Sequence, residues 1–284
     1  MGLAALPDPL YLLELRSTRL AVAELLLLAV AGGVLGAYVV LRRLAFYTHA
    51  VGTATFPGVV LAEAASFSPR LAALAVAGAY ATGVERAGRS GRDPGGAATG
   101  LMLVLALATG TILASDVFQS GAGVDRLLFG SAIALSDADV AVAAAAAVIA
   151  LASALLLGRA WSAVAFDPEG APALGVPGRR ADLALLLVVG ATAVAALPAV
   201  GSLLVTSLFV VPAAVARLLT RSVPGLVAAS VGVAAAQGLL GLYGALWLDV
   251  PPGPAIAVLG AAVYVLTAAT TALAPAGSLR GVAA

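Results

Sequence analysis

The chain has 284 residues, of which 62% are hydrophobic and only 10% are charged, and its formal net charge at pH 7 is +1. Its mean hydropathy is +1.09. Soluble domains are close to half apolar and a quarter charged, so this composition excludes an ordinary soluble domain and predicts an all-α, polytopic membrane helix bundle. The near-neutral net charge gives no reason to expect nucleic acid as a partner.

Two residue types are missing from the chain. It has no cysteine, and all fifteen of its basic residues are arginine. A P-loop needs a lysine on the phosphates and a Schiff-base enzyme needs a lysine amine, so neither is expected here. If ATP drives this protein, a separate polypeptide must bind it. With one histidine, no cysteine and no lysine, we expect a non-catalytic subunit that binds no cofactor of its own.

The apolar segments predict the number of membrane crossings. A bilayer core of about 30 Å needs about 20 apolar residues per helix. On this scale we expect nine spans, at residues 20–41, 48–66, 70–85, 97–115, 139–158, 183–198, 201–219, 224–247 and 254–274. As one helix, residues 183–219 would be about 55 Å long, so a break at residues 198–201 is favoured. Without that break there would be eight spans.

The arginines predict the orientation. If Arg42 and Arg43 are cytoplasmic, eleven arginines fall on the cytoplasmic side and four on the outer side, in agreement with the positive-inside rule. The N-terminus is then outside and the C-terminus inside, as nine spans require. We expect an outer interfacial segment at residues 1–19, a membrane domain at residues 20–275 and a cytoplasmic tail at residues 276–284.

The second span carries polar groups inside an apolar segment. It contains His49, the only histidine, followed four residues later by Thr53. That spacing places both on one helix face, with Gly52 on the same stripe and Thr55 close by. Polar groups at membrane depth usually face a water-filled path or the bundle interior, so these residues are candidates to line a path. A packing histidine bonded to a neighbouring carbonyl is the alternative.

Further residues are candidates for this path and its gate. Glu63 lies fourteen residues after His49 on roughly the same helix face, and could line the outer mouth. Proline removes a backbone donor and loosens a helix where it stands. The following residues are candidates for hinges or gates: Pro57, Gly58, Phe129, Gly130 and Pro212.

Residues 160–182 form a cytoplasmic loop between the fifth and sixth spans. Asp167 is a candidate N-cap, Pro168 suits a first helical turn, and Gly175 can end a helix in the left-handed conformation. We therefore expect a short helix here. The loop is longer than a turn requires, and its acidic start and apolar residues favour a docking element over a simple connector.

Four segments in this order resemble the permease subunit of bacterial ATP-binding-cassette importers for zinc, manganese or iron. The segments run from Arg42-Arg43 to Pro57-Gly58, over Leu128-Phe129-Gly130, from Phe166-Asp167-Pro168-Glu169 to Leu174-Gly175, and over residues 212–219. The resemblance covers roughly residues 20–275. It implies the transmembrane fold of a type II importer, a multi-pass location in the bacterial cytoplasmic membrane, and a homodimer.

The resemblance also implies partners and residue roles. A cytoplasmic ATPase would bind ATP and dock on the loop through Asp167, Pro168, Glu169, Leu174 and Gly175, and an extracytoplasmic binding protein would deliver a divalent metal ion. Where the family usually has an aspartate and, four residues later, a histidine, this chain has His49 and Thr53. His49 is the one candidate metal ligand, and the identity of the transported ion is left open.

One alternative of a different class also remains open, an ion-gradient-driven secondary carrier. Such carriers often have broken helices near the bilayer midplane, and Pro57 and Pro212 are candidate breaks. No clear internal repeat supports this alternative.

Overall fold

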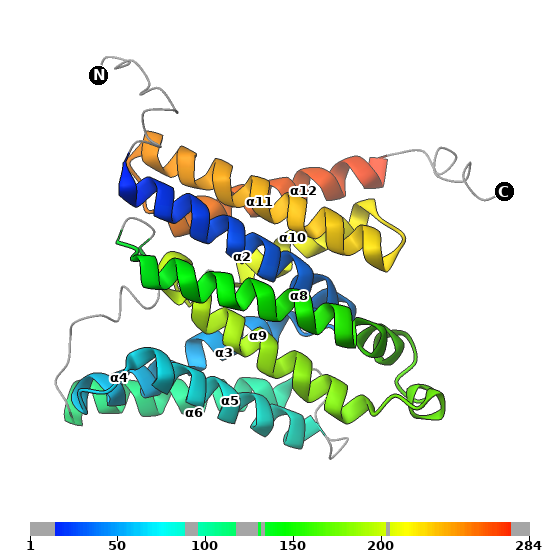
Figure 1. Ribbon diagram of the computed structural model, residues 1–284, viewed down its shortest axis with the longest axis horizontal. Helices are drawn as coiled ribbons and strands as arrows, with labels where there is room; N and C mark the ends of the chain where they lie inside the picture. Colours follow the sequence, from blue (N-terminus) through cyan, green and yellow to red (C-terminus); the bar gives the residue numbers. More distant parts are fainter. Residues whose placement is uncertain (1–14, 89–95, 118–129, 132–133, 203–204, 274–284) are drawn as a thin grey trace.

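The computed structural model describes residues 15–88, 96–117, 130–131, 134–202 and 205–273, and the elements assigned in these residues are all helical (Figure 1). The helices are α2 (Arg16–Leu41), α3 (Ala45–Ala54), α4 (Phe56–Ala64), α5 (Pro69–Gly88), α6 (Ala97–Ile112), α8 (Asp137–Phe166), α9 (Gly178–Val200), α10 (Val205–Leu219), α11 (Val223–Leu248) and α12 (Pro252–Leu273). A π-helical turn, η1 (Leu113–Val117), follows α6, and a 3₁₀ helix, η2 (Ala171–Leu174), follows α8.

Each of the nine expected spans corresponds to one of these helices, or to the pair α3 and α4. Successive segments run in opposite directions along the long axis of the bundle (Figure 1). Ion pairs join residues predicted to share a side. Arg16 and Arg70 pair with Asp137 and Asp139 at one end, called the outer end here. At the other end, called the cytoplasmic end here, Arg42 pairs with Asp182.

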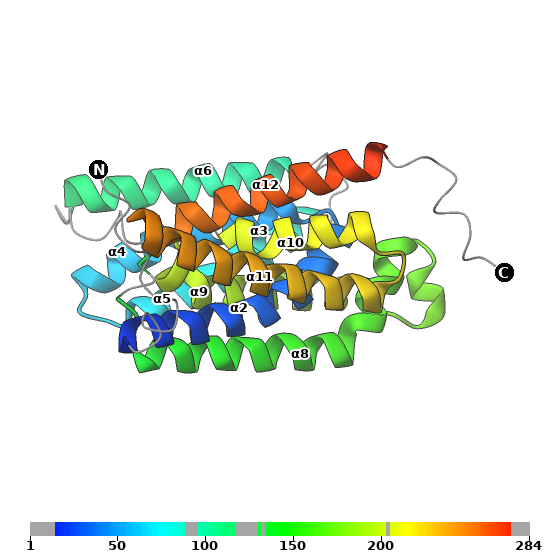
Figure 2. The ribbon, with the colours of Figure 1, turned by 90° about the horizontal axis from the view of Figure 1, so that it is seen from above.

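Some of the helices differ in length from the expected spans. Six helices, α2, α6, α8, α9, α11 and α12, are long and apolar enough to cross a bilayer by themselves. The others are shorter or less apolar, since α3 and α4 are two pieces of one crossing and α10 has 15 residues. Helix α8 has 30 residues and continues to Phe166, eight residues beyond the expected end (Figure 2).

The second crossing is broken at Thr55, which ends α3 and begins α4. Pro57 stands in the first turn of α4, where its missing N–H is tolerated. The Thr55 hydroxyl donates to the Gly52 carbonyl over 2.6 Å and so satisfies an acceptor at the end of α3. Pro57 thus marks a real break in this crossing, as the sequence suggested.

The expected break between the sixth and seventh crossings is also present. Helix α9 ends at Val200, and Gly201 has φ 73° and ψ 163°, a conformation that glycine alone adopts readily. Pro198 lies in the last turn of α9, and α10 begins at Val205. The apolar block of residues 183–219 is therefore two helices, and the expectation is confirmed.

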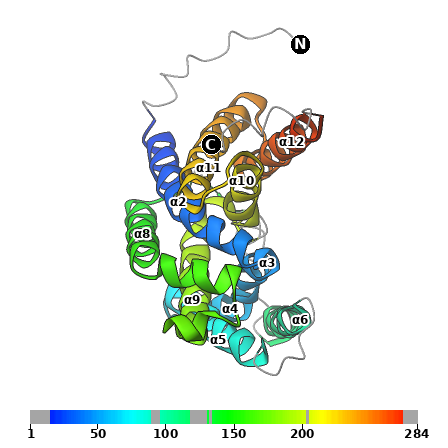
Figure 3. The same cartoon turned by 90° about the vertical axis from the view of Figure 1, so that its right-hand side faces the viewer.

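Helices α2 and α9 form the buried centre of the bundle, while α6 and α12 lie at its periphery (Figure 3). Helix α2 packs against α8, α10 and α11. Its glycines allow this packing, because a β-carbon on Gly36 would lie 2.1 Å from the Phe209 carbonyl oxygen of α10, and one on Gly33 would lie 2.6 Å from Cα of Val231 in α11. Close backbone approach of this kind is how helices associate in lipid.

Candidate translocation path and coupling loop

The candidate path residues lie on α3, at different depths from the surface. His49 is half-buried, and its imidazole has no hydrogen-bond partner among the residues that the structure describes. Thr53 is buried, and its hydroxyl donates to the His49 carbonyl over 3.3 Å. This bond uses the hydroxyl proton but leaves lone pairs on the oxygen. The packing alternative, a histidine bonded to a carbonyl, is not what is seen.

The loop between α9 and α10 packs directly on α3. A β-carbon on Gly52 would lie 3.5 Å from the carbonyl oxygen of Ser202, which is buried. Next to it, Gly130 has φ 68°, and a β-carbon there would lie 2.5 Å from the backbone nitrogen of Gly201. The backbone N–H of Ser131 donates to the Pro198 carbonyl over 2.8 Å. Three segments far apart in sequence therefore meet at Gly52, Gly130 and residues 201–202.

The other candidate hinge residues lie elsewhere. Gly58 packs on α5, where a β-carbon would lie 2.7 Å from Cγ2 of Val76. Pro212 is buried within α10. Glu63 is exposed near the end of α4, away from the contact between α3 and residues 201–202. Phe129 lies outside the described residues, as do residues 1–14 and 276–284 of the expected terminal segments.

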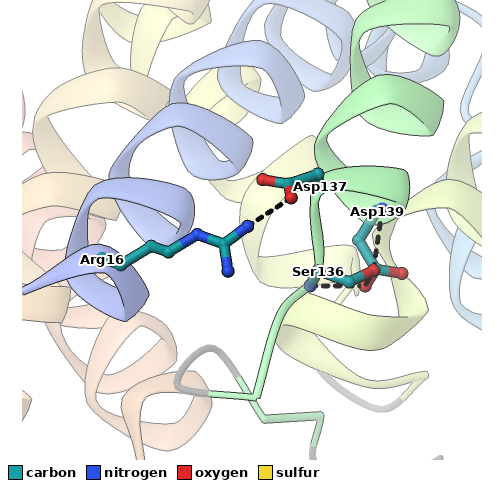
Figure 4. Close-up of polar contacts among 4 residues, drawn as sticks. All are labelled: Arg16, Ser136, Asp137 and Asp139. Carbon is teal, nitrogen blue, oxygen red and sulfur yellow. Dashed lines mark hydrogen bonds and ion pairs between the residues drawn. The ribbon is translucent and has the colours of Figure 1, made fainter.

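The outer end carries a charged cluster at the start of α8 (Figure 4). Ser136 caps α8, since its hydroxyl oxygen accepts from the backbone N–H of Asp139 and the Asp139 carboxylate accepts from the Ser136 backbone N–H. Asp137 pairs with Arg16 of α2, and Asp139 pairs with Arg70 of α5. Helices α2, α5 and α8 are thereby joined at this end.

Glu24 lies within α2 and is fully buried, with neither carboxylate oxygen hydrogen-bonded among the described residues. Its side chain points into the bundle rather than toward the surface. Asp139 and Arg70 interact with it electrostatically. Because Arg70 already pairs with Asp139, Glu24 lacks a partner of its own.

These carboxylates do not make a metal cage. Among the described residues, no three His, Cys, Asp or Glu side chains come close enough together to hold a metal ion. A hard divalent cation is usually held by several oxygen ligands, and a structural zinc ion by four protein ligands.

The expected helix in the cytoplasmic loop exists but is shorter than predicted. It is the 3₁₀ helix η2, and it begins at Ala171 rather than directly after Asp167. Asp167 ends α8, and its Oδ1 accepts from the backbone N–H of Gly170 over 2.8 Å. Gly175 ends η2 with φ 74°, the left-handed conformation expected of it. Asp167 therefore shapes the turn before the helix, where a carboxylate acceptor stabilises tight loops.

The loop projects from the cytoplasmic end of the bundle (Figure 1). Asp167, Pro168 and Glu169 are exposed, and Leu174 is an exposed apolar residue with 76% of its surface accessible. Ala171, in contrast, is fully buried and anchors the loop. The loop is therefore ordered, with the apolar side chain of Leu174 exposed at its tip.

The base of the loop is tied to the helices that surround it. Trp161 is buried, donates from Nε1 to the Ala181 carbonyl over 2.8 Å, and packs edge-on against Tyr38 of α2 with ring centroids 5.0 Å apart. Arg179 pairs with Glu85 of α5 over 3.0 Å. The two helices that hold the loop are therefore bonded to each other and to α2 and α5.

Helix α9 connects this loop to the candidate path. Asp182 of α9 pairs with Arg42, which lies just before α3. One turn further along α9, the Leu186 carbonyl accepts from the Tyr47 hydroxyl of α3 over 2.8 Å, and Gly190 then packs against Val51. A displacement of the loop along α9 would therefore act on the helix that carries His49.

Sequence reasoning missed several of these residues. Asp182 follows two arginines at the start of an apolar segment and was not singled out, although an acid beside a basic pair is a visible signal. The sequence predicted the break at residues 198–201, but not that Gly201 would pack against Gly130 or Ser202 against Gly52. Nothing local to Trp161 or Glu24 indicates what either faces, since that depends on α9 and on the packing around α2.

Comparison with known proteins agrees with this architecture. The model of the ABC 3 transport family matches residues 15–271. The manganese transport system membrane protein MntC of Halalkalibacterium halodurans is 27% identical over 246 residues, which cover 87% of this chain and 84% of that protein. The manganese import system permease protein ScaB of Streptococcus gordonii is 24% identical, with 87% and 88% covered.

The structure of PsaBC from Streptococcus pneumoniae in complex with Fab shares the fold, with a TM-score of 0.80, 22% identity, and coverage of 90% of this chain and 92% of that one. The resemblance noted from the four sequence segments is thus confirmed. With a family model matching nearly its whole length and alternating apolar helices that traverse the bundle, the chain belongs to the ABC 3 transport family, as its multi-pass membrane permease.

Proposed function

We propose that this permease works as a homodimer that imports a divalent metal ion, with a separate ATPase docked on the loop of residues 167–175. The observation that carries the proposal is the exposed, ordered loop at the arginine-rich end, with Leu174 in solvent and its base bonded toward α3. Manganese is the first ion to test, because it is the ion in the names of MntC and ScaB.

In this proposal the ion passes along α3 near His49 and Thr53. A half-buried imidazole with no internal partner can offer a nitrogen lone pair to a passing cation, and the Thr53 oxygen lies one turn away on the same face. Ser202, which packs on Gly52, and Gly130, which packs on Gly201, form the gate on the outer side. An extracytoplasmic binding protein delivers the ion there, with the exposed Glu63 at the entrance.

ATP binding in the partner moves the loop, and the move is transmitted through α9. The Arg42–Asp182 pair and the bond from Tyr47 to the Leu186 carbonyl link α9 to the turn before α3 and to the first turn of α3. A packed bundle of this kind favours two discrete arrangements rather than a continuous deformation, so loop motion selects between an outward-open and an inward-open path.

The test is co-purification with the cognate ATPase together with manganese uptake. Leu174→Ala removes the exposed apolar contact, and burying a leucine stabilises by about 1.5–3 kcal/mol, so ATPase binding should weaken by about ten-fold or more. Glu169→Ala should lower uptake per ATP hydrolysed. Ala173→Ser, an exposed neighbour in the same loop, is the matched control and should leave both unchanged.

A result from liposomes would contradict the proposal. If the purified chain, free of any ATPase, imports manganese and the uptake stops when an ionophore collapses the ion gradients, the protein is a secondary carrier. Uptake that requires the ATPase and persists with the ionophore present supports the importer.

A further inference from the structure

A second cytoplasmic feature is separate from the exposed tip of the loop. A cavity of about 620 Å³ lies where the ends of α2, α8 and α10 meet, and Arg42, Arg43 and Arg217 contribute all of its charged lining. Its apolar lining includes Leu41 and Phe166. No acidic residue of the described chain lines it.

Two of the three guanidinium groups are available to a ligand. Arg42 pairs with Asp182, which lies in the neighbouring cavity. Arg43 and Arg217 are exposed, and neither makes an ion pair with any described residue. Arg43 also has φ 58°, so the turn after α2 holds it in an uncommon backbone conformation. Like charges around one cavity repel each other, and a bound anion would relieve that repulsion.

The position of the cavity along the membrane normal matches that of the lipid headgroups, which are one source of anions. Arg16 and Arg42 are 26 residues apart along α2, which at 1.5 Å per residue is about 39 Å. A bilayer with its headgroups is about 40–45 Å thick, so if Arg16 lies at the outer headgroups, Arg42 lies at the inner ones. Phe166 and Leu219, 65% and 59% exposed, supply apolar surface beside the cavity for acyl chains.

We propose that this arginine cavity binds the phosphate group of an anionic phospholipid from the inner leaflet. Guanidinium groups suit phosphate because they donate paired N–H groups in a fixed plane. Basic pockets between transmembrane helices on the cytoplasmic side are suited to lipid headgroups. Pro168 lines the same cavity, so a bound lipid would contact the first turn of the coupling loop.

The test uses the full chain in nanodiscs of equimolar phosphatidylglycerol and phosphatidylcholine, with native mass spectrometry to count retained lipids. The wild type should retain phosphatidylglycerol in preference. Each basic residue near a membrane surface increases the preference for an anionic lipid about five-fold. In the double variant Arg43→Gln/Arg217→Gln, the preference for phosphatidylglycerol over phosphatidylcholine should therefore fall about 25-fold. The control Arg86→Gln/Arg159→Gln removes two exposed arginines at the same end that do not line the cavity, and should lose little.

Four results would overturn the proposal. The first is equal retention of the two lipids by the wild type, and the second is an equal loss in the control variant, which would indicate diffuse attraction. The third is a thermal stabilisation by inorganic phosphate with none by phosphatidylglycerol vesicles, which would assign the cavity to a soluble anion. Loss of the lipid whenever the ATPase binds would likewise assign these arginines to the protein partner.

Discussion

At the scale of single residues, the chain places polar atoms where the bundle can use them. Thr48 and Thr53 are both buried on α3, and each donates its hydroxyl to the carbonyl four residues earlier. Only Thr53 shares its face with His49, because the two are one turn apart. The two threonines therefore form a matched pair for separating transport from helix stability.

We expect Thr53→Val to lower the rate of manganese uptake several-fold and Thr48→Val to leave it unchanged. Both variants keep the side-chain shape and lose the same kind of backbone bond, so their effects on folding should be similar. His49→Ala should lower uptake further because it removes the nitrogen ligand. Uptake by cells that produce equal amounts of each variant is the measurement, and equal losses from the two threonine variants would place the path elsewhere.

Gly130 is a residue whose backbone cannot accept a side chain. With φ 68° and a β-carbon position 2.5 Å from the Gly201 nitrogen, Gly130→Ala meets both strain and a clash. The left-handed conformation alone costs about 1–2 kcal/mol, so the thermal unfolding temperature should fall. Gly232→Ala, inside α11 with nothing within 4 Å of its β-carbon, should keep or raise it. Similar behaviour of the two variants would mean that residues 130 and 201 are not in contact.

The effect of the buried Glu24 carboxyl on stability can be measured by replacing it with the amide of glutamine. Its carboxyl is fully buried without a hydrogen-bond partner among the described residues, and burying a polar group without a partner is unfavourable. Glu24→Gln keeps the shape and removes the ionisable group, so thermal stability should stay equal or rise. A marked loss of stability would show that the carboxylate has a partner, for example in a second conformation of the transporter.

At the scale of helices, the ion pairs at the two ends of the bundle differ in how much they contribute to stability. The Arg42–Asp182 side chains are 16% and 35% exposed and join α9 to the turn before α3. The Arg16–Asp137 side chains are both 71% exposed. Exposed pairs are weak because water screens them, whereas removing one partner of a shielded pair leaves a poorly solvated charge.

Asp182→Asn should therefore destabilise the protein by about 1–2 kcal/mol, while Asp137→Asn should have an effect close to zero. If α9 transmits loop motion, Asp182→Asn should also lower the amount of metal transported per ATP hydrolysed. Thermal unfolding and uptake measured beside ATPase activity check both statements. An unchanged transport ratio with lowered stability would make the pair structural only.

At the scale of the whole molecule, the proposed orientation can be tested directly because the chain has no cysteine. Leu174→Cys and Glu63→Cys introduce single exposed thiols at opposite ends of the bundle. An impermeant maleimide added to intact spheroplasts should label Glu63→Cys and spare Leu174→Cys, and inside-out vesicles should reverse this. Labelling of Leu174→Cys from outside would invert the topology and remove the basis for an ATPase on that loop.

Much of the architecture followed from local patterns. Apolar segment lengths predicted the crossings, the break before residue 205, and the all-helical class, since lipid leaves helices as the way to satisfy the backbone. The arginine distribution predicted which helix ends lie on the same side of the membrane. The Arg42–Asp182 and Arg16–Asp137 pairs agree with it, because each joins two residues predicted to share a side. Turn chemistry predicted the left-handed Gly175, because that conformation depends on a few neighbouring residues.

The sequence by itself determined that this chain is a multi-pass membrane permease, because hydrophobic length, charge sidedness and short ordered motifs are properties of consecutive residues. Only the tertiary structure decided which residues meet. It set Gly130 against Gly201, turned Glu24 into the bundle and bonded Tyr47 to α9. Such contacts join residues 71 or 139 positions apart, or depend on which helix face is covered, and small apolar side chains on every face leave that choice to packing.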